Sequence, residues 1–163
     1  MTRIMRDSTT AHDIPHTGLQ LVAGYSNGMY RWSLGDWLRF PGVPHVHVDV
    51  LGTDPRGSGV RDGETGDATV ATAVRWGKAR RALHPGAYAV VYCNRDTLTP
   101  LFNAMDAAGL KIGADFWTWI STLDGTRTVA DMTGVVAVQY EGEDLTHGHY
   151  DQSLVYDDHW HGN

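Results

Sequence analysis

Short apolar runs of strand length alternate with helix-like segments along most of the chain. The clearest run is Val43 to Leu51, where every second residue from Val46 to Val50 is a valine. The run from Ala87 to Cys93 is almost continuously apolar, as in a strand of a parallel sheet that is buried on both faces. Such alternation is typical of α/β proteins with parallel strands. The pattern therefore restricts the chain to a parallel barrel or an open parallel sheet.

The expected elements describe a barrel that is shorter than usual. We expect six or seven strands, at Leu19 to Tyr25, Val43 to Leu51, Val60 to Glu64, Ala87 to Cys93, Asp115 to Thr122, Val135 to Tyr140 and near Tyr150 to Val155. Only three segments are convincing helices, namely Leu34 to Phe40, residues 67–83 and Thr97 to Ala108. A full eightfold barrel usually needs about 200 residues or more, whereas this chain has 163. The sequence therefore predicts a single α/β domain, a shortened or distorted TIM-like barrel.

The beginning of the chain differs from the rest. Residues 1–18 are polar and show no periodicity. They also lack the apolar stretch of a secretory signal. We therefore expect a flexible N-terminal arm over 1–18, followed by the barrel over 19–163. We also expect the protein to be made in the cytoplasm, so any action outside the cell requires release or transport.

Charge and hydropathy exclude two classes of partner. Thirteen Lys and Arg against nineteen Asp and Glu give a formal net charge of −6, which offers no global support for binding nucleic acid. No apolar run reaches the length of about 18 residues that a membrane-spanning helix needs. The single cysteine, Cys93, lies in an apolar run and is expected to be a buried structural thiol. We expect neither a nucleic acid nor a membrane as partner.

Polar side chains follow several of the expected strands, where the active sites of parallel α/β folds lie. The sharpest group is Asp62-Gly63-Glu64, because residues i and i+2 of an extended segment point to the same face. Two carboxylates so placed push their pKa values apart, so one can stay protonated while the other is ionised. Carboxylates from several strands suit acid–base chemistry on sugars or an oxygen-liganded cation. A solvated loop over this segment is the alternative.

Other candidates also lie on strands or at strand ends. Asp49 either faces the site or pairs with a neighbouring arginine. Its face also carries His45 and His47, but ligands spread along about 13 Å of strand do not share one ion, so we expect no metal. Five aromatic residues on strands are candidates for stacking on sugar rings, with core packing as the alternative, and they are Tyr25, Tyr92, Trp117, Trp119 and Tyr140.

These motifs together resemble the family 25 glycoside hydrolases, which are lysozymes with an Asp-x-Glu pair on a β/α barrel and a further Asp late in the chain. The similar segments are Gly24-Tyr25, Asp62-Gly63-Glu64, Val91-Tyr92-Cys93-Asn94, Phe116-Trp117-Thr118-Trp119-Ile120, Val138-Gln139-Tyr140 and Gly148-His149-Tyr150-Asp151. The run from Val22 to Trp160 also resembles a short branch of such proteins in actinobacteria and their phages.

The resemblance implies a role for each matching residue. Glu64 matches the general acid, Asp62 its partner carboxylate, and Asp151 the late Asp that orients or polarises the site. The family also has an Asp at the end of its first strand, where this chain is expected to have Ser26-Asn27. Asn27 can hydrogen-bond a sugar but cannot act as a base.

The resemblance implies a muramidase that hydrolyses the glycan of bacterial peptidoglycan without a cofactor, encoded by a phage or an actinobacterium. Such a protein acts on the cell wall after release, or is associated with the virion. Because no carboxylate is expected at the end of the first strand, the alternative is a non-catalytic module. That module would bind glycan, or would be an accessory protein on the capsid or tail of a phage particle, in contact with other phage structural proteins.

Overall fold

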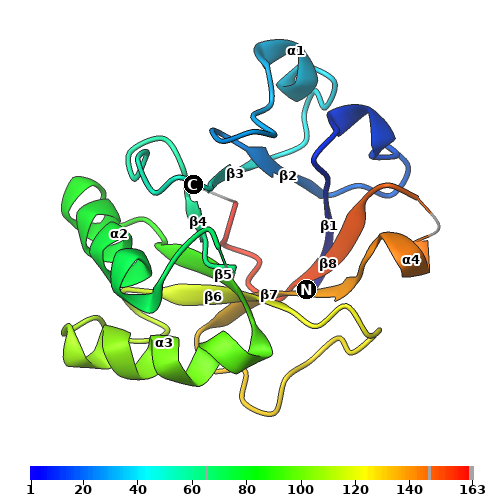
Figure 1. Ribbon diagram of the computed structural model, residues 1–163. Helices are drawn as coiled ribbons and strands as arrows, with labels where there is room; N and C mark the ends of the chain where they lie inside the picture. The colour runs from blue at the N-terminus through cyan, green and yellow to red at the C-terminus, as the bar shows by residue number, and fades with distance from the viewer. Residues whose placement is uncertain (65, 147, 162–163) are drawn as a thin grey trace.

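The computed structural model describes residues 1–64, 66–146 and 148–161, and these form a closed eight-stranded barrel (Figure 1). The strands are β1 (Arg3–Asp7), β2 (Leu21–Tyr25), β3 (His45–Asp49), β4 (Val60–Asp62), β5 (Val90–Asn94), β6 (Trp117–Ser121), β7 (Val135–Glu141) and β8 (Asp151–Val155). They follow one another around the barrel in chain order. Strands β1 to β7 are parallel, whereas β8 is antiparallel to both of its neighbours, β7 and β1.

The helices are few and uneven in length, which is the distortion that the short chain predicts. They are a 3₁₀ turn η1 (Ala11–Asp13), α1 (Leu34–Trp37), α2 (Val70–Leu83), α3 (Arg95–Ala107) and α4 (Glu143–Thr146). The two long helices, α2 and α3, lie side by side on the outside of the barrel near β4, β5 and β6 (Figure 1). The expected α/β barrel is therefore confirmed. Among the described residues, no helix has the length and apolar character needed to cross a membrane.

The prediction of a flexible arm over residues 1–18 is wrong, because β1 lies within it and is paired on both sides. Met5 of β1 is opposite Leu21 of β2 and opposite Ser153 of β8. The sequence hides this strand because three of its five residues are charged, namely Arg3, Arg6 and Asp7. In the barrel, Arg6 Nε donates to Gln152 Oε1 over 2.9 Å, and its Nη1 donates to the main-chain oxygens of Pro15 and Thr17. The barrel therefore includes Arg3–Asp7, and Leu21–Tyr25 is its second strand.

Apolar side chains fill the barrel and form further clusters outside it. The interior cluster includes Met5, Leu21, Val90, Trp119 and Trp160, and the last of these lies beside the N-terminal end of β1. One of these outer clusters packs α2 and α3 against β5 and buries Cys93. Burial raises the pKa of the Cys93 thiol to about 12, so this residue packs as a small apolar side chain and is not a nucleophile.

Candidate active site

Four carboxylates come from three parts of the barrel to its mouth, at the carboxyl ends of the parallel strands. Asp7 is the last residue of β1, Asp62 is the last residue of β4, and Glu64 follows two residues later. Asp151 is the first residue of β8, but that strand runs in the opposite direction, so its start lies at the same end. In a parallel barrel this end carries the active site.

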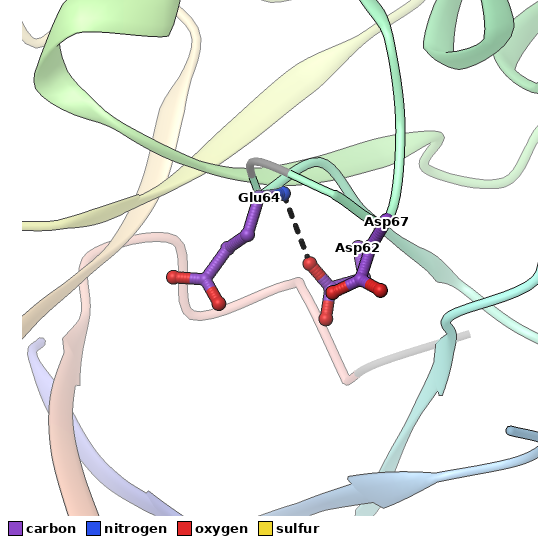
Figure 2. A group of neighbouring side chains, drawn as sticks. All are labelled: Asp62, Glu64 and Asp67. Atoms are coloured by element: carbon purple, nitrogen blue, oxygen red, sulfur yellow. Dashed lines mark hydrogen bonds between the residues drawn. The ribbon is translucent and has the colours of Figure 1, made fainter. Parts of the chain in front are cut away.

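The Asp62-Gly63-Glu64 segment is held rigidly and is not a solvated loop. Asp62 is only 4% exposed, and its Oδ1 accepts a hydrogen bond of 3.0 Å from the Glu64 amide (Figure 2). The Gly63 amide donates to Tyr92 O over 2.7 Å, which continues the pairing with β5. A Cβ atom on Gly63 would lie 2.5 Å from that same oxygen, so only glycine fits. The close approach fixes the direction of both carboxylates.

A buried amide joins the carboxylates on the opposite side of the mouth. Gln139 of β7 is 1% exposed, and its Nε2 lies 3.2 Å from Oδ2 of Asp7 and 2.9 Å from Oδ2 of Asp151. The Tyr92 hydroxyl donates to Gln139 Oε1, which turns the amide nitrogen toward the two acids. Tyr92, Gln139 and the two acids therefore form one hydrogen-bonded network across the barrel.

Burial raises the pKa of every carboxyl group in this cluster. The pKa of Asp62 rises to about 6, mainly through burial, and the neighbouring charges of Glu64 and Asp67 add to the shift. The pKa of Asp151 also rises to about 6, through burial and then the charge of Glu143. Burial, then the charge of Asp151, moves the pKa of Asp7 well above its ordinary value. Burial raises the pKa of Glu64 as well. The cluster therefore retains protons at pH values where exposed carboxyl groups have lost them.

A cleft of about 480 Å³ opens over this mouth. Asp62, Glu64 and Asp67 line it together with Tyr25 and Tyr30, so acidic and aromatic side chains share its surface. Tyr92 and Trp119 lie below it, around a small space that Asp7 and Asp62 also line. The volume is in the range of ordinary small-ligand sites. A sugar in this cleft would meet both aromatic rings and carboxylates.

The structure separates the five aromatic candidates. Tyr25, Tyr92 and Trp119 line the small space below the cleft, where Tyr92 and Trp119 are buried and belong to the interior core. Trp117 does not line this space, since it is the first residue of β6 and packs against Tyr88, with ring centroids 4.4 Å apart, at the opposite end of the barrel. Tyr140 lies outside the barrel, where its hydroxyl accepts a hydrogen bond of 2.7 Å from Gln152. Strand alternation explains this, because its neighbour Gln139 takes the inward position.

Asp49 and Asn27 hold a loop, which corrects their expected role in binding substrate. Asp49 is fully buried, and its carboxylate accepts hydrogen bonds from Trp76 Nε1 over 2.9 Å and from the amides of Gly52, Thr53 and Asp54. Asn27 Nδ2 donates to the same carboxylate over 2.7 Å. Asp49 lies on the outer face of β3 because the valines of that strand fill the interior.

The histidines on that face also have a packing role. His47 stacks on Trp37 of α1, with ring centroids 4.1 Å apart. The acids at the cleft form a different group, since Asp62, Glu64 and Asp67 each bring an oxygen within 4.8 Å of the others (Figure 2). Oxygen ligands so placed could hold a divalent cation.

Sequence reasoning missed Asp7 and gave Gln139 no role in the site. The prediction of an arm over residues 1–18 leaves Asp7 out of the site, because Met5 and Asp7 at alternate positions are only a weak strand signal. With β1 recognised, the first strand does end in a carboxylate. The resemblance expects one at that place, so the apparent departure at Ser26-Asn27 disappears.

Comparison with known proteins supports the fold and no more. No family model matches the chain, and no curated protein matches it. Among solved structures, a family 25 glycosyl hydrolase from Bacillus anthracis superposes with a TM-score of 0.59 and 12% sequence identity, over 96% of this chain and 90% of that one. At this identity the likeness concerns the fold alone. The chain therefore has a barrel like that of the family 25 glycosyl hydrolases.

Proposed function

We propose that this protein hydrolyses the glycan of bacterial cell walls, with the specificity of a muramidase. The observation that carries the proposal is the convergence of four carboxylates at the mouth of the barrel, namely those of Asp7, Asp62, Glu64 and Asp151. The cleft of about 480 Å³ over this mouth is large enough for a sugar. Glycoside hydrolysis needs one carboxylic acid that is still protonated and one carboxylate nearby. Raised pKa values in the cluster meet the first requirement.

The positions of the carboxylates suggest a division of labour. Glu64 is half-buried and lines the cleft, so it can protonate the leaving oxygen of a bound sugar. Asp62 lies deeper, fixed by the Glu64 amide, and would activate water or stabilise the developing positive charge. Asp151 and Asp7, joined through Gln139, would orient the sugar and keep the site negative. This mechanism uses no metal and no cofactor.

The alternative of a non-catalytic module loses its main support. It rested on the apparent lack of a carboxylate at the end of the first strand, and Asp7 stands at that position. The proposed substrate lies outside the cytoplasm. The proposal therefore includes action at the wall after release from the producing cell, or as part of a phage particle.

The test is hydrolysis of purified peptidoglycan by the wild-type protein, Glu64→Gln and a control, Asp106→Asn, which changes an exposed acid on α3. Loss of turbidity and release of reducing ends would be followed between about pH 4 and 8. We expect Glu64→Gln to lose a factor of about 10²–10⁴ in rate with its circular dichroism unchanged, and Asp106→Asn to behave as wild type. Absence of hydrolysis by the wild-type protein over this range would overturn the proposal.

A further inference from the structure

A second depression lies beside the cleft, on the other side of a rim. It measures about 440 Å³, close to the size of the cleft, and we call it the α2 groove. It is lined mainly by Leu51, Pro55, Arg61, Asp67, Arg75 and Trp76. Leu51 and Asp67 line both depressions and so form the rim between them. A ligand that fills the cleft needs only to pass these two residues to enter the groove.

The floor of the α2 groove contains a buried arginine, Arg61, that forms no direct ion pair with a carboxylate among the described residues. Arg61 is 2% exposed, and its Nη1 and Nη2 donate to the main-chain oxygens of Asp49, Val50 and Asp67. Its Nε is buried with no hydrogen-bond partner among the described residues, and no ion pair of Arg61 is found within them. The carboxylates of Asp49, Asp62 and Asp67 lie near this guanidinium, but it contacts only carbonyl oxygens, so a further anion nearby would stabilise the buried charge.

Two further features add positive potential at the same place. Arg75 lies exposed on α2 and lines the groove. The groove also includes Thr69, the N-cap of this 14-residue helix, and the N-terminal end of a helix attracts negative charge. The whole chain carries a net charge of −6. The positive character of the groove is therefore local.

The rim separates this positive groove from the acidic cleft. The Asp67 carboxylate lies with those of Asp62 and Glu64, all within 4.8 Å of one another (Figure 2), whereas the Asp67 carbonyl oxygen accepts from Arg61. One residue thus presents its negative charge to the cleft and a main-chain oxygen to the groove arginine. A ligand that spans the rim would need a neutral part over the acids and an anionic part over Arg75.

We propose that the α2 groove binds a carboxylate-bearing peptide attached to the glycan whose sugars occupy the cleft. This rests on the proposed function, since wall glycan carries short peptides with free carboxylates. The carboxylate would be placed near Arg75 and the N-terminus of α2. Aliphatic parts of the peptide would contact Leu51, Pro55 and Trp76. The groove would then select glycan that bears peptides over bare glycan.

The experiment measures binding, so that it does not depend on hydrolysis. Three probes are titrated by calorimetry into the Glu64→Gln protein: a wall disaccharide with a free-carboxylate tetrapeptide, the same molecule with amidated carboxylates, and the disaccharide alone. Arg75→Ala is added in the same background. Lys78→Ala is the matched control, because it removes an exposed positive charge from the same helix outside the groove. Arg61 is left intact because it holds the surrounding main chain.

We expect the free-carboxylate probe to bind most tightly, and Arg75→Ala to weaken it about three- to fivefold, as for a partly exposed ion pair. Arg75→Ala should leave binding of the bare disaccharide unchanged, and Lys78→Ala should leave all three affinities unchanged. Equal affinity for the free-carboxylate and amidated probes would overturn the proposal. Peptide-dependent binding in a protein that fails to hydrolyse wall would uphold the groove and reject the proposed reaction. Hydrolysis of wall by a protein that binds all three probes equally would uphold the proposed reaction and reject the groove.

Discussion

Asp7 and Asp151 lie directly opposite each other in the ladder between β1 and β8. Two like charges at such a position destabilise a sheet. The Nε2 of Gln139 lies within hydrogen-bond distance of both carboxylates, at 3.2 Å from Asp7 and 2.9 Å from Asp151. This amide offsets part of their repulsion, and the raised pKa values of the two acids offset more, because a proton removes the charge. The site is therefore a costly arrangement that the fold tolerates.

The first prediction concerns this amide. Gln139→Met keeps the volume but removes the donor shared by Asp7 and Asp151, and we expect the free energy of unfolding at pH 7 to fall by about 1–3 kcal/mol. Near pH 4 the two acids are protonated and need the donor less, so the loss should be smaller. Urea unfolding at both pH values measures the difference. An equal loss at the two pH values would show that the amide acts only through packing and its bond to Tyr92.

The second prediction is that stability falls as pH rises from about 4 to 6. Asp62 and Asp151 have folded-state pKa values of about 6, above the ordinary value of 3.8, and burial also raises the pKa of Asp7 well above its ordinary value. Over this window the folded protein holds protons that the unfolded chain has lost, so raising the pH favours unfolding. Acids with a lowered pKa, such as Asp115 and Asp124, make the folded state more stable as pH rises, but only below about pH 4, where they titrate.

Urea unfolding at a series of pH values checks this, with Asp7→Asn as the diagnostic variant. The amide cannot ionise, so the variant should be more stable than wild type at pH 7, by on the order of 1–2 kcal/mol, and should depend less on pH. Asp106→Asn serves as the exposed control. A wild-type stability that increases steadily from pH 4 to 7 would contradict the prediction.

The fold could be predicted from local patterns wherever a strand is apolar by itself. The runs around β3, β5 and β7 are of this kind, and each became a strand of the barrel. Strand β1 gives only a weak local signal, because two of its five residues are arginines, and Arg3 and Arg6 each have a partner near the other end of the chain, at Asp157 and Gln152. Only the closed barrel brings these partners together, so no local pattern reports them.

The lack of a local signal also explains which residues of the site could be predicted from the sequence. Asp62 and Glu64 share one segment, so their spacing makes them candidates, and Asp151 is a candidate from its place at the last expected strand and from the resemblance. Asp7 was missed with its strand. Asp49 was misplaced for another reason, since the alternation that puts Val46 and Val48 inside the barrel turns Asp49 outward. The sequence alone shows that Asp49 and the two valines lie on opposite faces of the strand.

The third prediction concerns the pH dependence of the proposed hydrolysis. The charge of Asp67 raises the pKa of both Asp62 and Glu64. Asp67→Asn removes that charge, so the last proton of the pair should be lost at a lower pH. We expect the alkaline limb of the profile of kcat/KM against pH to move to lower pH in this variant. Asp106→Asn should leave the profile in place, and an alkaline limb unmoved in Asp67→Asn would exclude its influence on the acid.

The last prediction tests whether the rigid turn between the two cleft acids matters. Gly63→Ala would place a Cβ 2.5 Å from Tyr92 O and 2.8 Å from Cγ1 of Val91. Because one of these atoms belongs to the main chain, the segment itself must move, and we expect a loss of about 1–3 kcal/mol in the free energy of unfolding.

The displacement should also reach activity, because it shifts Asp62 and Glu64 relative to each other. We therefore expect kcat to fall by more than the loss of folded protein explains, measured on samples that circular dichroism shows to be folded. Gly86→Ala is the matched control, since a Cβ there meets no heavy atom within 4 Å, and it should change neither stability nor rate appreciably. A folded Gly63→Ala protein with wild-type kcat would show that the chemistry tolerates movement of the pair, and the assignment of Glu64 and Asp62 as acid and partner would then lose its geometric basis.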